Sequence, residues 1–429
     1  MLERGMGRAS AAEEAGVVVL NTCTVTESAD RDVRAAIRRI HRENPECRIL
    51  VTGCYAQRAP QELATLPGVQ WVVGNSHKHQ VAELVAPAEA AFVPVANLTP
   101  VPRQPFSNST NQQIFVGDIF AHTELLAAPV FAAETASEKT RPNLKVQDGC
   151  DNRCSFCIIP AVRGQSRSLE RAEAIREVRA LAAAGYREVV LSGINLGRWG
   201  RDFARPERFA GLVRAILAET ELEKLRLSSV EPMDWTPELI ELVASEPRLA
   251  KHAHLPLQSG SDRILRAMHR KYRPWHYRER VEKIRRALPR AALGADVMVG
   301  FPGETDALFE ESRAFIASLP FTYLHVFTYS SRPGTASAEM PGQVPVRVAR
   351  ERNRVLRELA AEKNREFRES LVGETLEAIT LERGDGESTA ALTDNYLKLR
   401  LAGRHGANQW VRAEVQGVSQ EGLIGTLSH

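Results

Sequence analysis

Hydrophobic residues in the first part of the chain gather in short β-branched runs separated by helical patterns. Val17–Leu20, Ile49–Val51 and Trp71–Val73 are apolar runs of strand length, and a polar helical pattern covers about Ala29–Asn44. Such alternation favours a parallel sheet covered by helices. We therefore predict a doubly wound parallel α/β domain over residues 1–86.

The next segment, residues 87–140, has a different pattern. It is rich in Pro, Ala, Ser, Thr and Asn and has no sustained hydrophobic period. Such composition is typical of linkers. We predict a linker or irregular excursion that ends near Arg141.

From Arg141 onward, strand-like runs alternate with helical stretches. The six runs are Leu144–Gln147, Val189–Leu191, Leu225–Ser228, His254–Leu257, Ala295–Val299 and Leu324–Tyr329. Six βα units are two short of a closed eight-stranded barrel, so we predict a partial (β/α)6 barrel over residues 141–370. In such folds the chemistry lies at the carboxyl ends of the strands.

The last part of the chain changes to short strands. A long helix rich in Arg and Glu covers Val346–Ser370, and five strand-like runs follow at 374–382, 388–392, 396–401, 409–418 and 422–427. Their length and spacing suit a small antiparallel β-barrel of the oligonucleotide-binding kind. We predict this third domain over residues 371–429.

Composition narrows the class of protein. The 429 residues are 43% hydrophobic and 25% charged, with a net charge of +3, which excludes a disordered or collagen-like chain. No apolar run approaches the roughly 20 residues that span a bilayer. The first residues hold Glu3, Glu13 and Glu14 and lack the apolar core of a secretory signal. We expect a cytoplasmic protein that makes no membrane contact.

The cysteines carry the strongest chemical signal. Six cysteines are too few for a disulfide framework in a chain of this size, and in a reducing compartment clustered cysteines are more often ligands. Cys150, Cys154 and Cys157 crowd within eight residues just after the first predicted barrel strand. Structural zinc takes four ligands, and the flanking histidines, His122 and His252, are far away in the sequence. An iron–sulfur cubane takes four thiolates, so three cysteines leave one iron open to another ligand.

The surrounding residues resemble a known family. The C-x3-C-x2-C run with Phe156 is similar to the signature of radical S-adenosylmethionine enzymes, in which the open iron binds the amino and carboxylate groups of that cofactor. Further motifs resemble the methylthiotransferases, which install a methylthio group on a tRNA base or a ribosomal protein. These motifs are Asn21-Thr-Cys23-Thr-Val-Thr26, Thr52-Gly-Cys54-Tyr55, Gln147-Asp-Gly-Cys150, Ile158-Ile-Pro160, Arg163-Gly164, Ser166-Arg-Ser168, His254-Leu-Pro-Leu-Gln-Ser-Gly-Ser261 and Val299-Gly-Phe-Pro-Gly-Glu-Thr305. The final barrel resembles the TRAM domain of that family.

The resemblance implies cofactors, partners and site residues. It implies a [4Fe–4S] cluster on Cys150, Cys154 and Cys157, and bound S-adenosylmethionine. Its expected partners are the anticodon stem-loop of tRNA, an electron donor such as flavodoxin or ferredoxin, and a sulfur donor, and we expect a monomer. Cofactor contacts are expected at Phe156, Ser192, Gly193, Asn195, Ser228, Ser229, Glu231, Gln258, Ser259, Gly300 and Glu304. The Gly-Phe-Pro-Gly run at 300–303 is open to a second interpretation, a tight turn into a helix.

The family also carries a second cluster on three cysteines of the first domain. Cys23 and Cys54 match two of them, and the third lies upstream of the region with which Met1 aligns, so we expect the second cluster to be incomplete in this chain. Cys47 is a poor substitute, since the seven residues that separate it from Cys54 span roughly 20 Å as a strand. We interpret Cys47 as a buried apolar thiol.

Charge suggests where RNA binds. Residues 263–290 hold eleven Lys and Arg against two Glu, which suits either a phosphate-facing surface or a solvated helix face. Residues 371–429 hold five basic and eight acidic groups, so RNA binding by the last domain must depend on single positions. The candidates are Tyr396, Lys398, Arg400 and Trp410.

The motifs most resemble the branch that acts on N6-threonylcarbamoyladenosine beside the anticodon. The isopentenyladenosine branch is the alternative, and the ribosomal-protein branch comes third. A threonylcarbamoyl group brings a carboxylate, so a cation is expected in the pocket, and Arg198, Arg201, Arg270 and Arg332 are the candidates. A different class, a zinc-stabilised RNA-binding protein without catalysis, also stays open.

Overall fold

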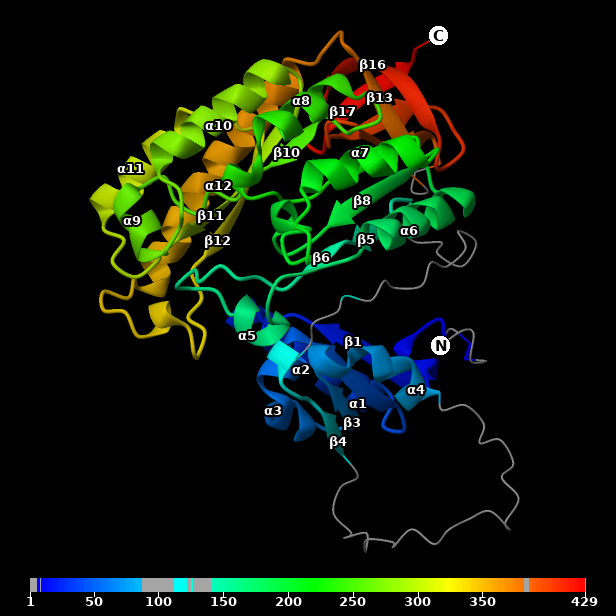
Figure 1. Cartoon of the computed structure of the whole chain (residues 1–429), viewed down its shortest axis with the longest axis vertical. Coiled ribbons are helices and arrows are strands. Elements are labelled where there is room, and N and C mark those ends of the chain that lie inside the picture. The colour runs from blue at the N-terminus through cyan, green and yellow to red at the C-terminus, as the bar shows by residue number, and fades with distance from the viewer. Residues whose placement is uncertain are drawn as a thin grey trace, which may run out of the picture. The chain divides into compact units, whose positions relative to one another are not determined.

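The computed structural model of the protein describes residues 6–7, 9–86, 112–121, 125, 140–381 and 386–428. Contacts divide the chain into two compact units (Figure 1). The first unit comprises Met1–Thr123, Phe156–Gly164 and Ser330–Ala338, and the second comprises Glu124–Ser155, Gln165–Tyr329 and Glu339–His429. The structure gives two units where the sequence predicted three domains and a linker, so the predicted domain boundaries stay predictions.

The first unit is built on a parallel sheet. Its strands, in spatial order, are β1 (Val17–Thr22), β2 (Arg48–Gly53), β3 (Val69–Val73) and β4 (Gln113–Phe115). Its α-helices are α1 (Glu27–Glu43), α2 (Cys54–Arg58), α3 (Pro60–Ala64), α4 (Val81–Val85) and α5 (Ile159–Arg163). The predicted parallel α/β architecture is confirmed.

The sequence predicted an irregular segment over 87–140, but strand β4 lies within it. Its three residues pair in parallel with β3, and they are too few to show a hydrophobic period. The parts of this predicted linker at 87–111, 122–124 and 126–139 lie outside the described residues.

Local signals in the sequence determine where α1 begins and how β2 ends. The Thr26 side chain accepts a hydrogen bond from the Ala29 backbone N–H at 3.2 Å and so caps α1. Gly53 has a φ of +103°, and a Cβ atom there would lie 2.4 Å from the Thr22 carbonyl oxygen. Only glycine fits this turn, which passes directly from β2 into Cys54 at the start of α2.

The second unit contains an open barrel made of two three-stranded parallel sheets. One sheet has the order β5 (Asn143–Lys145), β8 (Glu188–Ser192), β9 (Lys224–Leu227), and the other β10 (His252–His254), β11 (Ala292–Val299), β12 (Tyr323–Thr328). Isolated bridges from Leu225 to Leu249 and from Ser229 to His254 join the two sheets. The predicted six βα units are confirmed, although the fourth strand ends at His254 rather than Leu257.

Helices bury their apolar faces against these strands. They are α6 (Arg171–Ala183), α7 (Phe209–Glu219), α8 (Pro237–Ser245), α9 (Asp262–Ala267), α10 (Pro274–Ala287), α11 (Asp306–Ala317) and α12 (Val346–Glu369). Helix α12 runs beside the edge strand β12 (Figure 1). A two-stranded antiparallel ribbon, β6 (Gln147–Asp148) with β7 (Arg167–Ser168), closes the base of the cysteine loop. Among the described residues, no helix is both long and apolar enough to cross a membrane.

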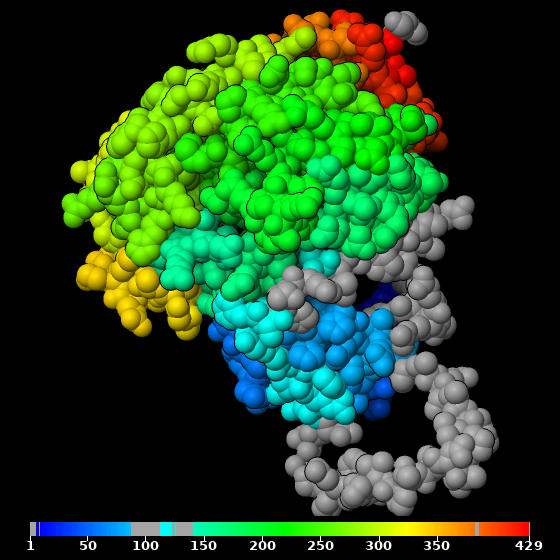
Figure 2. All heavy atoms as spheres, viewed as in Figure 1, coloured from blue at the N-terminus to red at the C-terminus, as the bar shows by residue number. Residues whose placement is uncertain are grey.

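The final segment forms a small closed barrel, as predicted. The strands follow the order β13 (Thr375–Thr380), β14 (Ser388–Thr393), β15 (Lys398–Ala402), β17 (Leu423–Leu427), β16 (Trp410–Val418). All its pairs are antiparallel except β15 with β17. The small barrel (orange to red) abuts the open barrel (green) in Figure 2, and the Lys224 Nζ donates to Glu377 Oε2 at 2.7 Å across this junction.

Candidate active site

The cysteine loop of the second unit begins at a buried glutamine. Gln147 is fully buried, and its Nε2 donates hydrogen bonds of 2.9 Å to the carbonyl oxygens of Asp148 and Gly149. Its Oε1 accepts from the Asn195 backbone N–H at 2.7 Å. Gln147 therefore joins the start of the cysteine loop to the loop that follows β8. The sequence analysis included this residue in a motif but assigned it no role.

Two of the predicted ligand thiols meet polar donors. The Asn195 side-chain amide lies 3.8 Å from Cys150 Sγ, and Arg270 Nη1 donates to Cys154 Sγ at 3.3 Å. Burial raises the pKa of the Cys150 thiol, and a bound cluster would hold this residue as a thiolate. Hydrogen bonds to sulfur are also a usual feature around iron–sulfur clusters. The donors therefore suit the predicted cluster.

Asn195 also offers an unused acceptor. Its side chain is 5% exposed, and its Oδ1 is buried without a hydrogen-bond partner in the described part of the chain. Gly193 packs closely here, since a Cβ atom would lie 3.0 Å from the Gln147 side chain. A buried amide oxygen without a partner fits the ammonium group expected from bound S-adenosylmethionine. The arrangement thus fits the cofactor contacts predicted at Ser192, Gly193 and Asn195.

Their contacts group Phe156 and Cys157 with the first unit, to which α5 also belongs. Both residues are half-buried. Along the chain they follow Cys154 by two and three residues. Their predicted roles in cluster and cofactor binding stay predictions.

The other predicted cofactor residues follow strands β9, β10 and β11. Gln258 has a φ of +66°, and its backbone N–H donates to the Asp296 carbonyl at 2.8 Å. Ser228, Ser229 and Glu231 follow β9, and Ser259 follows Gln258. Their cofactor contacts stay predictions.

Glu304 is held by structural contacts. Its Oε1 accepts from the Gly300 backbone N–H at 2.9 Å and from Arg352 of α12 at 2.7 Å. Burial raises the pKa of this carboxyl group. These contacts favour the tight-turn interpretation for the segment that contains Gly300 and Glu304.

In the first unit, Cys23 and Cys54 follow neighbouring strands. Residues Thr22 and Gly53, which precede them, are paired in the sheet. Cys23 is exposed, whereas Cys54 is 3% exposed and accepts hydrogen bonds from Arg163 Nε at 3.1 Å and Asn75 Nδ2 at 3.5 Å. No sequence signal pointed to Asn75.

Cys47 lies in the apolar core of the first unit. It is 2% exposed and belongs to the same buried cluster as Ile37 and Ile49. Burial raises the pKa of its thiol. The prediction of a buried apolar thiol is confirmed.

A cavity of about 340 Å³ opens between the strands of the second unit. Its lining includes the arginines Arg141 and Arg226, the histidines His252, His254 and His325, and the tyrosines Tyr323 and Tyr396. Of its lining residues only Val190 and Leu227 are aliphatic. The sequence analysis missed this cavity because its residues are single positions on different strands.

Comparisons with known proteins agree with this site. Residues 144–316 match the Radical SAM superfamily, and residues 1–74 match a family described as Uncharacterized protein family UPF0004. Threonylcarbamoyladenosine tRNA methylthiotransferase MtaB of Aquifex aeolicus is 36% identical over 96% of this chain and 93% of its own. The MtaB protein of Bacillus subtilis is 37% identical over 94% of this chain and 85% of its own.

This chain belongs to the radical SAM tRNA methylthiotransferases. It is therefore an enzyme that transfers a sulfur-containing group to tRNA, with S-adenosylmethionine and a [4Fe–4S] cluster as cofactors. A relative in Thermobifida fusca named tRNA-2-methylthio-N(6)-dimethylallyladenosine synthase is 35% identical over 97% of this chain and 79% of its own. Among solved structures, the methyltransferase TsrM of Kitasatospora setae has a TM-score of 0.53 at 16% identity, over 75% of this chain and 64% of its own, which shows a shared fold.

The four arginines predicted as substrate cations all have carboxylate partners in the methylthiotransferase. Arg198 and Arg201 pair with Asp234 at 3.5 and 2.7 Å, and Arg270 pairs with Glu231. Arg332 is 3% exposed and pairs with Asp30 in the first unit. Sequence reasoning missed these partners because they are distant in the chain.

Some of the residues expected to bind RNA already form ion pairs within the protein. In the run 263–290, Arg266, Arg273, Arg278 and Lys283 have carboxylate partners on α9 and α10. On the small barrel, Lys398 and Arg400 lie on the exposed face of β15, Tyr396 is 42% exposed, and Trp410 is half-buried beside Lys224. RNA contacts by these residues stay predictions.

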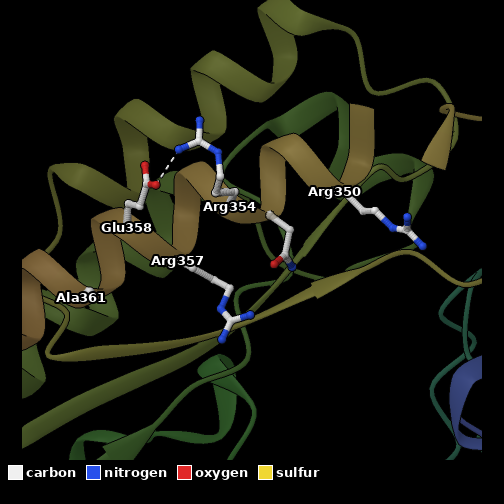
Figure 3. Close-up of a pocket in the computed structure, with 6 residues that line it drawn as sticks. Arg350, Arg354, Arg357, Glu358 and Ala361 are labelled. Carbon is white, nitrogen blue, oxygen red and sulfur yellow. Dashed lines mark hydrogen bonds and ion pairs between the residues drawn. The ribbon is translucent and has the colours of Figure 1, made fainter. Parts of the chain in front are cut away.

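A further basic groove of about 410 Å³ lies along α12. Figure 3 shows Arg354 and Glu358 turned toward each other, while Arg350 and Arg357 extend from another side of the helix. Neither Arg350 nor Arg357 has an ion-pair partner among the residues that the structure describes. This pair is therefore available to an outside anion.

Proposed function

We propose that this methylthiotransferase modifies C2 of N6-threonylcarbamoyladenosine beside the tRNA anticodon. The observation that carries the proposal is the pair of arginines that line the cavity of the second unit, Arg141 and Arg226. Both approach the fully buried Glu188, at 3.6 and 2.5 Å, and Arg226 also donates to the backbone carbonyls of Asp394 and Thr393. Arg141 is therefore the guanidinium group that suits the carboxylate of a threonylcarbamoyl group. An isopentenyl group would need no cation there.

The isopentenyladenosine branch is the second candidate. It is favoured by relatives with the dimethylallyladenosine synthase name, at 33 to 36% identity. Relatives with the MtaB name span 32 to 37%, so overall identity does not separate the branches. The chemistry of the cavity is the stronger argument.

In this proposal Cys150, Cys154 and Cys157 hold the cluster. When bound, the cluster and S-adenosylmethionine together supply a reductively generated carbon radical that can remove a hydrogen atom from the substrate. Asn195 Oδ1 would accept a hydrogen bond from the amino group of bound S-adenosylmethionine, and Arg270 donates a hydrogen bond to the Cys154 sulfur. These residues place the reacting groups in fixed positions.

We further infer that Cys23 and Cys54 bind the sulfur-carrying centre of the first unit. Arg163 and Asn75 donate hydrogen bonds to the Cys54 sulfur and so hold this side chain in a fixed position. An electron donor such as flavodoxin or ferredoxin and a separate sulfur donor complete the reaction. We expect the enzyme to act as a monomer in the cytoplasm, where its tRNA substrate is found.

Nucleoside analysis of tRNA tests the proposed substrate. We would digest tRNA from cells that lack the gene and quantify modified adenosines by mass spectrometry, with the native gene and Cys154→Ala as complementing copies. The proposal expects loss of methylthio-threonylcarbamoyladenosine, with recovery by the native copy alone. Loss of only the methylthio-isopentenyl nucleoside would assign the enzyme to the other branch.

A further inference from the structure

Three neighbouring strands bring two histidines and an aspartate together at the cavity of the second unit. His325 on β12 is paired directly with Asp296 on β11. His254 on β10 is paired with Gly294, two residues before Asp296. Because side chains alternate between the faces of a strand, this register places His254, Asp296 and His325 on one face of the sheet.

The distances in this cluster match those between ligands of one metal ion. Asp296 Oδ1 lies 3.3 Å from His254 Nε2 and 3.2 Å from His325 Nδ1. One nitrogen or oxygen atom from each residue lies within 4.8 Å of the others. Metal bonds of about 2.0–2.2 Å in tetrahedral geometry place two ligand atoms about 3.3–3.6 Å apart. Little movement would therefore be needed to bind an ion.

Burial provides an independent argument. His254 is 7% exposed, and its Nε2 atom is buried with no hydrogen-bond partner among the described residues, although it faces Asp296. A buried polar atom without a partner is costly and calls for an explanation. A metal ion would satisfy this nitrogen. The His325 side chain is 52% exposed, which leaves the cluster open to ions from solvent.

We propose that His254, Asp296 and His325 bind one divalent first-row transition metal ion of the Zn²⁺ or Fe²⁺ class. Two imidazoles and one carboxylate suit these ions and leave coordination positions open. Because His254 and His325 line the cavity, the open positions would be available to water or to an anionic oxygen there. This site uses no cysteine. Nor does it depend on the proposed substrate, because metal binding is measured without tRNA.

Zinc is the probe for the first test. Anaerobically reconstituted native enzyme would be dialysed against Zn²⁺, as would His325→Ala, Asp296→Asn and the control His276→Ala, an exposed histidine on α10. We expect about one tightly bound zinc in the native and control proteins. Loss of a direct ligand should weaken binding by at least about tenfold. Iron content and circular dichroism confirm that each variant retains its cluster and fold.

X-ray absorption of the bound zinc gives a second readout. The proposal expects nitrogen and oxygen ligands at about 2.0–2.1 Å, whereas zinc on the cysteines would show sulfur at about 2.3 Å. A sulfur shell, or equal zinc retention by all four proteins, would overturn the proposal. So would a native enzyme that retains no zinc. Each of these results leaves the tRNA substrate assignment intact, because that assignment is tested separately by nucleoside analysis.

Discussion

At the scale of single residues, Arg270 lies between a thiol and a carboxylate. Its side chain is 5% exposed, it donates to Cys154 Sγ, and it pairs with Glu231. Removing one partner from a buried ion pair leaves the other uncompensated. A sequence pattern could place Arg270 near a strand end but could not show that its charge was already used.

Arg270→Met should therefore be strongly destabilising. We expect a loss of about 3 kcal/mol of unfolding free energy, because Glu231 would be left without its guanidinium partner. Adding Glu231→Gln should recover part of that loss. Thermal unfolding of the two single variants and the double variant measures the coupling, and strictly additive effects would contradict the pairing.

Cys47 and Cys54 differ in their surroundings, so they should respond differently to replacement by alanine. Cys47→Ala removes a core side chain and should cost about 1 kcal/mol of stability without changing the iron content. Cys54→Ala should lower the iron content of the reconstituted enzyme. Iron assays on both variants check this, and iron loss from Cys47→Ala would show that Cys47 is a ligand.

At the scale of elements, strands β10 to β12 form one wall of the cavity. Gly294 leaves room for the Tyr323 ring, since a Cβ atom at Gly294 would lie 1.9 Å from Tyr323 Cζ. The Tyr323 hydroxyl group lies 2.7 Å from His252 Nε2. Packing of this wall thus depends on glycine at position 294, because any larger side chain would clash with the Tyr323 ring.

Gly294→Ala should displace the Tyr323 ring and destabilise the protein by about 1–3 kcal/mol, the usual cost of overpacking a core. Gly417→Ala is the matched control, because nothing lies within 4 Å of a Cβ atom there. Thermal denaturation compares the two variants. Equal melting temperatures would show that the Tyr323 ring moves at no cost.

On helix α12, Arg350 and Arg357 should contribute to the affinity of the enzyme for tRNA. Replacing Arg350 and Arg357 with glutamate should weaken tRNA binding and reduce the slope of log affinity against log salt by about one for each lost phosphate contact. Arg365→Glu is the control on the same helix, since Arg365 pairs with Glu369 and does not line the groove. Binding isotherms at several salt concentrations test this. A similar loss in the control would indicate a non-specific charge effect.

At the scale of the whole molecule, the cysteines with proposed roles lie in both units. Cys150 and Cys154 belong to the second unit with Asn195, whereas Cys23, Cys54 and Cys157 belong to the first. Because Cys54 and Cys154 are proposed to hold different centres, loss of Cys54 should affect a different step from loss of Cys154.

Cys54→Ala should keep formation of 5′-deoxyadenosine but lose methylthio transfer, whereas Cys154→Ala should lose both. Anaerobic assays with dithionite quantify 5′-deoxyadenosine and methylthio nucleosides in parallel. Retained methylthio transfer by Cys54→Ala would contradict the proposed role of the first unit.

Local sequence patterns were enough to predict the types of helix and strand and the cysteine chemistry. Apolar runs such as Ile49–Val51 predicted strands because a buried parallel strand needs a continuous hydrophobic run. The cysteine loop was predictable for a similar reason, since its three thiols are close in the chain. Cys47 was predictable as buried because a free cysteine is usually a buried apolar residue, and it precedes β2 whereas Cys54 follows that strand.

Features made from residues that are distant in the chain depend on how the chain folds. Strand β4 exists because its short segment completes an edge of the first sheet. The cavity and its His254, Asp296 and His325 cluster arise only when strand register aligns three strands. The partners of Arg198, Arg201, Arg270 and Arg332 likewise come from other segments. The local sequence pattern predicts which face of a helix or strand a residue occupies. Only the packed fold determines which side chains meet on that face.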